Sequence, residues 1–399
     1  MKNIYANTVL RLLKNINDGT LVLTLPDQRQ INFGDLRFIE KAIHVEIHDW
    51  SVFKKIVRRG DIGFAEAFIE GLWTTNQLED LLRLILKNRA HLESLIYGSW
   101  IGSLVYKIRH FLHRNTRKGS KKNIHAHYDL GNAFYKLWLD PSMMYSSALF
   151  ENDSTRTLEQ AQHAKCDRIL DQLHCQTNDR ILEIGCGWGN FMERAKIRGI
   201  QTTGLTLSVE QKKYIEEEFL SKNPTQDGNI STVELRDYRD CHTQFDGIAS
   251  IEMFEAVGES YWPTYFQTLF RCLKNGKKAV IQTIVIRDEL FEKYRSETDF
   301  IQQYVFPGGM LPSPKIFESA ASNAGLVLKE QFSFGQDYAK TLRLWGDRFN
   351  AQLEAIKQLG FTDEFIRLWN FYLMYCAAGF AQQDIDVIQF TLEKPLHAS

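Results

Sequence analysis

Three glycines at alternate positions follow an apolar run, and they are the first residues that indicate chemistry. The segment ILEIGCGWGN, residues 181–190, places Gly185, Gly187 and Gly189 directly after a strand-like stretch. Glycine adopts positive φ without strain and lets the backbone approach a ligand closely. A dinucleotide-binding fold would carry G-x-G-x-x-G here, with an acid at the end of the second strand. Asn190 occupies the position of the third glycine, and no acid ends the second strand in TLSVEQ, so both departures argue against a nicotinamide dinucleotide.

Two acids close to these glycines favour S-adenosylmethionine instead. Glu183 lies two residues before the first glycine, and Asp237 follows a third strand-like run, in LRDYRD. The amino acid portion of this methyl donor would lie over the glycine turn, and its adenosine would cross the ends of the next strands. Ligands in open α/β sheets bind at the carboxyl ends of the strands, where these residues would converge. The pattern therefore predicts a site for S-adenosylmethionine.

Strands alternate with helices from about residue 160 onward. The strand-like runs are RILEI, TTGLTL, STVEL, FDGIASI and KKAVIQTI, and helical segments separate most of them. This succession predicts an α/β domain with a mostly parallel, Rossmann-like sheet. The last segment, DVIQFTLEKP, is interpreted as a late antiparallel strand beside the others.

The first 90 residues predict a separate, smaller α+β domain. LVLTL, a turn at residues 26–28 and QINFG form a hairpin pattern, and residues 42–47 alternate as a further strand. Helices are expected over residues 51–59, ended by Gly60, through GFAEAFIEGLW, and from about Asn76, where Glu79 is placed for a capping box.

Residues 91–122 combine an apolar helix with a basic linker. The apolar stretch ends in GSWIGSLVY, and the following KIRHFLHRNTRKGSKKN contains lysine and arginine but no acid. An apolar helix next to cationic residues suits the surface of an anionic membrane. A solvated linker between two domains is an equally good interpretation.

Composition limits the partners and the compartment. The chain has 399 residues, of which 44% are hydrophobic and 24% charged, enough for two domains with substantial cores. A formal charge of −1 provides no overall attraction to nucleic acid, so no nucleic acid partner is expected. The six cysteines show neither zinc-site nor disulfide-framework spacing, which favours a reducing cytoplasm. The N-terminal segment does not predict a secretory signal, and no apolar run reaches the roughly 18 residues that would predict a membrane-spanning helix.

Six longer motifs occur in order over about residues 120–395, and together they resemble the cyclopropane-fatty-acyl-phospholipid synthase family, which includes the mycolic acid cyclopropane synthases. The resemblance implies a class I S-adenosylmethionine-dependent methyltransferase fold over residues 123–399, with a seven-stranded sheet whose last strand is antiparallel. Residues 1–90 resemble the extra domain of the phospholipid-acting members, for which lipid binding or a homodimer contact is expected. The motifs are HYDLGNAFYKLWLDPSMMYSSALF, LEIGCGWG, GLTLSVEQ, IEMFEAVG, DFIQQYVFPGGMLPS and YCAAGF.

The resemblance also implies which residues bind the methyl donor. Tyr128, Tyr145 and Ser146 would lie beside its methionine portion, with Gly185 and Gly187 beneath it. Ribose and adenine would be contacted by Leu207, Gln211, Asp237 and Tyr238.

The implied reaction is methyl transfer to a cis double bond of a phospholipid acyl chain, at the inner face of the membrane. Transfer leaves a carbocation, and a base must remove a proton before a cyclopropane ring closes. In the family that base is implied to be a bound bicarbonate, held here by Glu255, Tyr338 and the backbone of Ile284. Two positions depart from the family pattern: Ser147 replaces a cysteine and Gln282 replaces a histidine. Neither replacement titrates near neutrality, which leaves a methylene-branched or methyl-branched product open.

Other interpretations stay open. The donor fold also hosts methyltransferases that act on small molecules, and the two replacements suit a binding protein without turnover. Glu252 could pair with Glu255 as an acid and base, although a helix N-terminal or donor-binding role is preferred. His44, Glu46 and His48 alternate on one strand face, where a solvated polar surface is favoured over a metal site, so no metal is expected.

Overall fold

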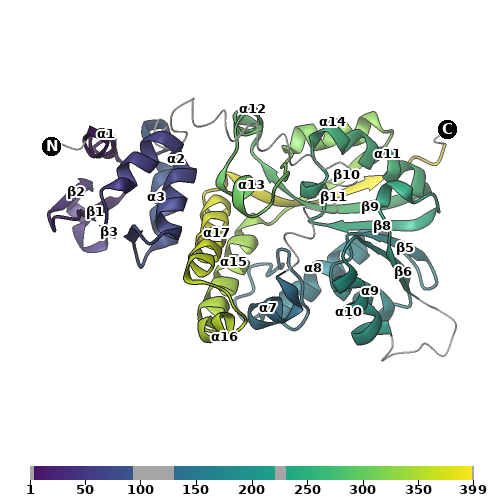
Figure 1. The fold of residues 1–399 in the computed structure, drawn as a ribbon. Coiled ribbons are helices and arrows are strands. Elements are labelled where there is room, and N and C mark those ends of the chain that lie inside the picture. Colours follow the sequence, from purple (N-terminus) through teal and green to yellow (C-terminus); the bar gives the residue numbers. More distant parts are fainter. Residues whose placement is uncertain (1–3, 93–129, 221–230, 398–399) are drawn as a thin grey trace. The chain divides into compact units, whose positions relative to one another are not determined.

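The computed structural model describes residues 4–92, 130–220 and 231–397, which fall into two compact units (Figure 1). Unit 1 lies within residues 1–112, 293–307 and 345–384, and unit 2 within residues 113–292, 308–344 and 385–399. These units differ from the contiguous ranges 1–90, 91–122 and 123–399 expected from the sequence, because two later segments group with the N-terminal residues. Tyr128 and the basic linker lie outside the described residues.

Unit 2 is built on a seven-stranded sheet in the order β10-β11-β9-β8-β5-β6-β7. Neighbouring strands from β9 to β7 are parallel, whereas β11 is antiparallel to both β9 and β10. The prediction of a mostly parallel sheet with a late antiparallel strand is therefore confirmed. The strands are β5 (Arg180–Ile184), β6 (Gln201–Thr206), β7 (Thr232–Leu235), β8 (Phe245–Ile251), β9 (Leu273–Ile286), β10 (Val327–Ser333) and β11 (Ile385–Glu393).

Helices cover both faces of this sheet, with α8, α9 and α10 on one side and α11 and α14 on the other (Figure 1). Because helices cover both faces, strands such as β8 are buried along their whole length. The helices with residues in unit 2 are α7 (Gly131–Trp138), α8 (Leu158–Leu173), α9 (Asn190–Ile197), α10 (Val209–Tyr214), α11 (Trp262–Cys272), α12 (Asp288–Ser296), α14 (Pro314–Asn323) and α15 (Gly335–Asn350). Short helical turns are η2 (Ile215–Leu220), η3 (Tyr238–Asp240), η4 (Phe254–Ala256) and η5 (Glu259–Tyr261).

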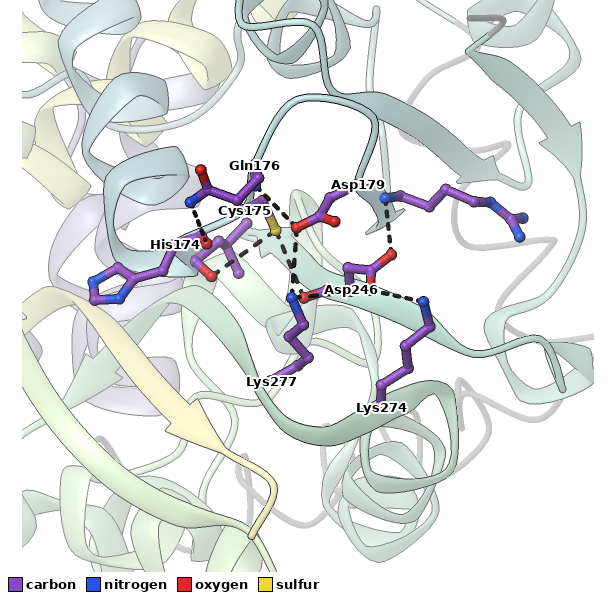
Figure 2. Close-up of polar contacts among 9 residues, drawn as sticks. His174, Cys175, Gln176, Asp179, Asp246, Lys274 and Lys277 are labelled. Carbon is purple, nitrogen blue, oxygen red and sulfur yellow. Dashed lines mark hydrogen bonds and ion pairs between the residues drawn. The ribbon is translucent and has the colours of Figure 1, made fainter. Parts of the chain in front are cut away.

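Polar residues tie together the amino ends of three strands, β5, β8 and β9 (Figure 2). The backbone N–H of Arg180 donates to Asp246 Oδ2 over 3.1 Å, and Lys274 Nζ lies 2.7 Å from Asp246 Oδ1. Lys277 Nζ lies 3.5 Å from Asp179 Oδ2. These charged and polar groups satisfy one another's hydrogen bonds at the amino ends of the strands. In open α/β sheets ligands bind at the opposite, carboxyl ends.

Unit 1 contains a four-stranded sheet in the order β2-β1-β3-β4. The predicted hairpin is confirmed, because β1 and β2 are antiparallel, and β3 buries Ile43, Val45 and Ile47 while His44 and Glu46 are exposed. Its strands are β1 (Thr20–Thr24), β2 (Gln30–Gly34), β3 (Ile43–Ile47) and β4 (Trp73–Thr74). Its helices are α1 (Ile4–Leu13), η1 (Leu36–Lys41), α2 (Ser51–Ile69), α3 (Leu78–Lys87), α13 (Phe300–Tyr304), α16 (Leu353–Gln358) and α17 (Asp363–Ala381), together with the ends of α12 and α15.

Helix α2 is sharply kinked at Gly60, where the sequence predicted a helix end. Gly60 has φ 58° and ψ −131°, which separates the two expected helices. The predicted capping box of α3 is wrong, because the helix begins at Leu78 and Glu79 is then its second residue rather than its third.

Helix α17 explains why residues 345–384 belong to unit 1, since it packs against α2 and α3. Arg367 Nε donates to the carbonyl of Ile69 over 2.6 Å, and Arg89 Nη2 lies 2.6 Å from Asp384 Oδ2. Periodicity marks α17 as a helix but does not identify the helices it packs against. None of the described helices is both long enough and apolar enough to cross a bilayer.

The kink in α2 predicts that Gly63 tolerates no side chain. A Cβ at this position would overlap the backbone carbonyl of Lys55 and would also lie 2.9 Å from Arg59 Cβ. We expect Gly63→Ala to lower the free energy of unfolding by about 2 kcal/mol, as overpacking typically does. Gly346→Ala in α15 is the matched control, because the new Cβ would meet only the mobile end of Met374, at 2.8 Å. Equal stability of both variants in urea unfolding would contradict the prediction.

Candidate active site

Helix α8 holds the segment that carries Ser146. Lys165 is fully buried, and its Nζ donates to Ser146 Oγ over 2.6 Å and to Gln162 Oε1 over 2.7 Å. Gln162 Nε2 donates to the Ser146 carbonyl over 2.8 Å. Lys165 was not among the residues predicted from the sequence. Helical spacing could have found it, because it lies four residues after Ala161 and four before Ile169, on the buried face of α8.

The glycine turn after β5 has the backbone geometry that the sequence predicted. Gly185 and Gly187 have φ values of 83° and 50°. A Cβ on Gly185 would lie 2.8 Å from Met253 Cγ, whereas a Cβ on Gly187 would meet nothing within 4 Å. Close packing therefore requires the first glycine, and the second leaves an open backbone that a ligand can approach.

Glu183 supplies an unsatisfied carboxylate next to this turn. It is 2% exposed, and its Oε2 has no hydrogen-bond partner among the described residues. Burial raises the pKa of Glu183 well above its usual value, and the positive charge of Lys165 opposes that shift. An orphaned buried carboxylate fits the cationic amino group of S-adenosylmethionine, which would restore the missing partner.

The residues expected at the adenosine lie near the ends of the next two strands. Leu207 directly follows β6 and is half-buried, and Gln211 Oε1 accepts from Thr206 Oγ1 over 2.7 Å. Asp237 follows β7 and accepts from Arg239 Nε over 2.8 Å. Tyr238 is the next residue, and burial raises its pKa.

Aromatic rings surround Tyr145. Its ring centroid lies 5.5 Å from those of Tyr135 and Trp138. Tyr135 in turn lies 5.1 Å from Trp188, which is part of the glycine turn. The structure therefore brings Tyr145 and Ser146 to the same region as Gly187, whereas Tyr128 is outside the described residues.

Glu252 lies at the centre of the residues that were expected to hold bicarbonate. Its Oε1 accepts from the backbone N–H of Ser147 and from Gln282 Nε2, both over 2.8 Å. Its Oε2 accepts from the hydroxyl of Tyr338 over 2.6 Å. The hydroxyl of Ser147 donates to the Ala148 carbonyl over 3.0 Å, so within the described residues the backbone N–H of Ser147, and not its side chain, contacts Glu252. The Ala148 carbonyl belongs to the next residue and lies within reach of the short Ser147 side chain.

The backbone of Glu252 is strained. This residue follows β8 with φ 50°, although it is not a glycine. Its N–H donates to the Gln282 carbonyl over 2.8 Å. A non-glycine residue with positive φ persists where its surroundings over-determine the conformation, which is typical of functional sites. An acid at the carboxyl end of a central strand was the sequence signal for this role, and it was assigned to helix capping or donor binding instead.

Glu255, in η4, forms the second carboxyl group of the site. Its Oε1 accepts from the backbone N–H of Ile284 over 2.6 Å, and its Oε2 has no partner among the described residues. Burial, together with the nearby Glu252, raises the pKa of Glu255 to about 8. Burial also raises the pKa of Glu252, but Lys165 and three donated hydrogen bonds oppose that rise. Hydrogen bonds and Lys165 thus favour the charged form of Glu252, whereas the like charge of Glu252 favours the neutral form of Glu255.

Comparison with known proteins identifies the family. The family model for mycolic acid cyclopropane synthetase matches residues 115–390. The tuberculostearic acid methyltransferase UfaA1 of Mycobacterium tuberculosis is 35% identical over 348 residues, which cover 85% of this chain and 80% of the relative. The cyclopropane-fatty-acyl-phospholipid synthase of Escherichia coli is 31% identical over 352 residues, covering 88% of this chain and 87% of the relative.

Solved structures agree with this result. The cyclopropane synthase MmaA2 from Mycobacterium tuberculosis superposes with a TM-score of 0.64 at 31% identity, covering 69% of this chain and 98% of that one. The mycolic acid cyclopropane synthase CmaA1, in complex with S-adenosylhomocysteine and CTAB, also has a TM-score of 0.64, at 32% identity over 69% of this chain and 98% of that one. With its class I methyltransferase sheet and its open glycine turn beside an orphaned carboxylate, the chain belongs to the mycolic acid cyclopropane synthetase family of S-adenosylmethionine-dependent methyltransferases.

Proposed function

We propose that this enzyme transfers a methyl group from S-adenosylmethionine to a cis double bond in the acyl chain of a phospholipid, and that Glu252 accepts the proton that completes the reaction. The observation that carries the proposal is the carboxylate of Glu252, which contacts three of the residues expected to hold bicarbonate. Ser147, Gln282 and Tyr338 all donate to it.

The chemistry requires a base near the acyl chain. S-adenosylmethionine supplies an electrophilic methyl group when bound. Attack by the double bond forms the new carbon–carbon bond and leaves a positive charge on the neighbouring carbon of the acyl chain. Loss of a proton from the added methyl group, with closure of the ring, gives a cyclopropane. A 1,2-hydride shift before proton loss gives a methylene branch, and addition of an external hydride gives a methyl branch.

Bicarbonate fits these residues poorly. The three donors named above bind Glu252, and the N–H of Ile284 binds Glu255. An added anion would have to displace a carboxylate from its donors and would lie beside two acidic side chains. Both effects oppose binding. Three hydrogen-bond donors and the charge of Lys165 favour the ionised form of Glu252, which would let it take over the role expected for bicarbonate.

The choice of a phospholipid substrate rests on the length of the similarity. The match to the Escherichia coli phospholipid synthase covers 88% of this chain, whereas the match to MmaA2 covers 69%. Unit 1 thus contains sequence shared with a relative named for phospholipids. An enzyme that acts on phospholipid acyl chains works at a membrane surface, and peripheral association with the inner face of the membrane belongs to the same proposal.

A branched product is the second candidate. The tuberculostearic acid methyltransferase matches this chain at 35% identity, and its name indicates methyl transfer to a fatty acid. Because Glu252 is a base within the site, the branch would arise by proton loss as a methylene group, which a separate reductant would convert to methyl. Mass spectrometry and proton NMR of the lipid product distinguish the ring from the branch.

The first test is the dependence of turnover on Glu252. We expect Glu252→Gln to lower turnover on unsaturated phospholipid vesicles by at least about 100-fold, because it removes a general base. Affinity for S-adenosylmethionine, measured by calorimetry, should change by less than about threefold, since the amide conserves the shape of the side chain. Glu354→Gln, at an exposed position in α16, is the control and should retain full activity. Full activity of Glu252→Gln would exclude it as the base.

The second test concerns bicarbonate itself. Turnover of the unmodified enzyme in degassed, carbonate-free buffer should rise by less than about twofold when bicarbonate is added, because its binding positions are already filled. Stimulation of fivefold or more would mean that bicarbonate displaces Glu252 and acts as the base.

The third test concerns the methyl donor. Glu183→Gln should raise the dissociation constant of S-adenosylmethionine by about tenfold, because a charge-assisted hydrogen bond to its amino group is lost. Isothermal titration calorimetry measures this change, and thermal unfolding of the free protein checks that the fold is retained. An unchanged dissociation constant would remove Glu183 from the donor site.

A further inference from the structure

A line of hydrogen bonds leads from Glu252 across the sheet to the surface of unit 2. Gln282 in β9 and Gln389 in β11 are register partners, and both side chains are fully buried. Gln389 Nε2 donates to Gln282 Oε1 over 3.0 Å, and Arg168 Nη1 in α8 donates to Gln389 Oε1 over 3.0 Å. Arg168 is itself held by Glu330, 2.7 Å away.

The direction of every bond in this line follows from the arginine. A guanidinium group can only donate, so the end of the Gln389 amide that faces Arg168 must be its oxygen. Its NH2 group therefore points toward Gln282 and needs an acceptor there. The oxygen of Gln282 must face Gln389, and its NH2 group must face Glu252. Arg168 is separated from Glu252 by two side-chain amides, and it thus sets which atom of Gln282 meets the carboxylate.

The two oxygens of Glu252 consequently differ. Oε1 receives two groups that can only donate, the N–H of Ser147 and the NH2 of Gln282. A proton on Oε1 would collide with both donors. Oε2 faces the hydroxyl of Tyr338, which can rotate and accept instead of donate. A proton removed from the substrate can therefore be held on Oε2 alone.

We propose that Arg168 and Gln389 are positioning residues that lock the amide of Gln282 with its NH2 group toward Glu252, so that Glu252 stays an acceptor at Oε1 and takes the substrate proton on Oε2. This inference rests on the proposed role of Glu252 as the base. Gln282 replaces the histidine of the family pattern at this position, and an amide has no charge of its own, so its direction must come from its neighbours.

The other charged groups around Glu252 are unchanged when Arg168 or Gln389 is replaced. Lys165 in α8, Glu255 in η4 and Tyr338 in α15 face Glu252 directly. Glu183 in β5 and Asp140 act on Lys165. Arg168 is separated from Glu252 by two amides, so its effect through the hydrogen bonds can be separated from these charges by mutation.

The experiment is the pH profile of turnover on unsaturated phospholipid vesicles for the full chain. Turnover should fall as the pH drops through the pKa of Glu252, because a protonated base cannot accept a proton. In Arg168→Met and in Gln389→Met the Gln282 amide can reverse, which stabilises protonated Glu252 and raises its pKa. We expect the acidic limb to move up by about one pH unit, equivalent to about a tenfold loss at a pH below the limb and little loss above it.

Three comparisons make the result specific. Gln389→Met keeps the charge of Arg168, so a shift in this variant cannot come from lost charge. Arg168→Lys keeps a group that only donates and should restore the original limb. Glu330→Gln still accepts from Arg168, so it should leave the acidic limb within about 0.2 pH unit of that of the unmodified enzyme.

The outcomes separate this inference from the proposed function. Absence of lipid turnover by the unmodified enzyme overturns the proposed function. If the unmodified enzyme turns over lipid and the acidic limb of its pH profile is unchanged in both Arg168→Met and Gln389→Met, the positioning role alone is overturned. A uniform loss of activity at all pH values would also overturn it, because that result indicates general damage to the fold. If one variant fails to unfold cooperatively, the other decides.

Discussion

The active site depends on keeping a carboxylate ionised among protein atoms. Desolvation opposes the charge of Glu252, and the free energy must be recovered from donors whose positions do not change. Three such donors come from the loop before α8, from β9 and from α15, and Lys165 adds a positive charge from α8. Helices and strands far apart in the chain must therefore pack accurately before this one group can serve as the base that we propose.

Lys165 serves more than one acid. Its charge opposes the burial-induced pKa shifts of both Glu183 and Glu252, which belong to different parts of the site. It also holds Ser146 in place through a hydrogen bond. Desolvation lowers the pKa of Lys165, and its charge acts on both of the carboxyl groups to which we assign donor binding and proton transfer.

The carboxyl groups of Glu252 and Glu255 differ in their tendency to ionise because their surroundings differ. Glu255 has one donor and a neighbouring negative charge, so it retains its proton near neutral pH. Glu252 has three donors and a neighbouring positive charge, which favour its ionised form. The sequence motif IEMFEAVG contains both acids within four residues and does not distinguish them.

The sequence alone determined the parts that depend on local pattern. Alternating strands and helices, the positive-φ glycines at 185 and 187, the kink at Gly60 and the late antiparallel strand all follow from residue type and spacing. Tertiary structure decided the rest: that residues 293–307 and 345–384 group with unit 1, that the Ser147 hydroxyl turns to Ala148, and that Glu252 lies among the donors expected for bicarbonate. Spacing along a chain determines which face of an element a side chain occupies. It does not determine which atoms from other elements meet it there, and the charge of a buried group depends on those atoms.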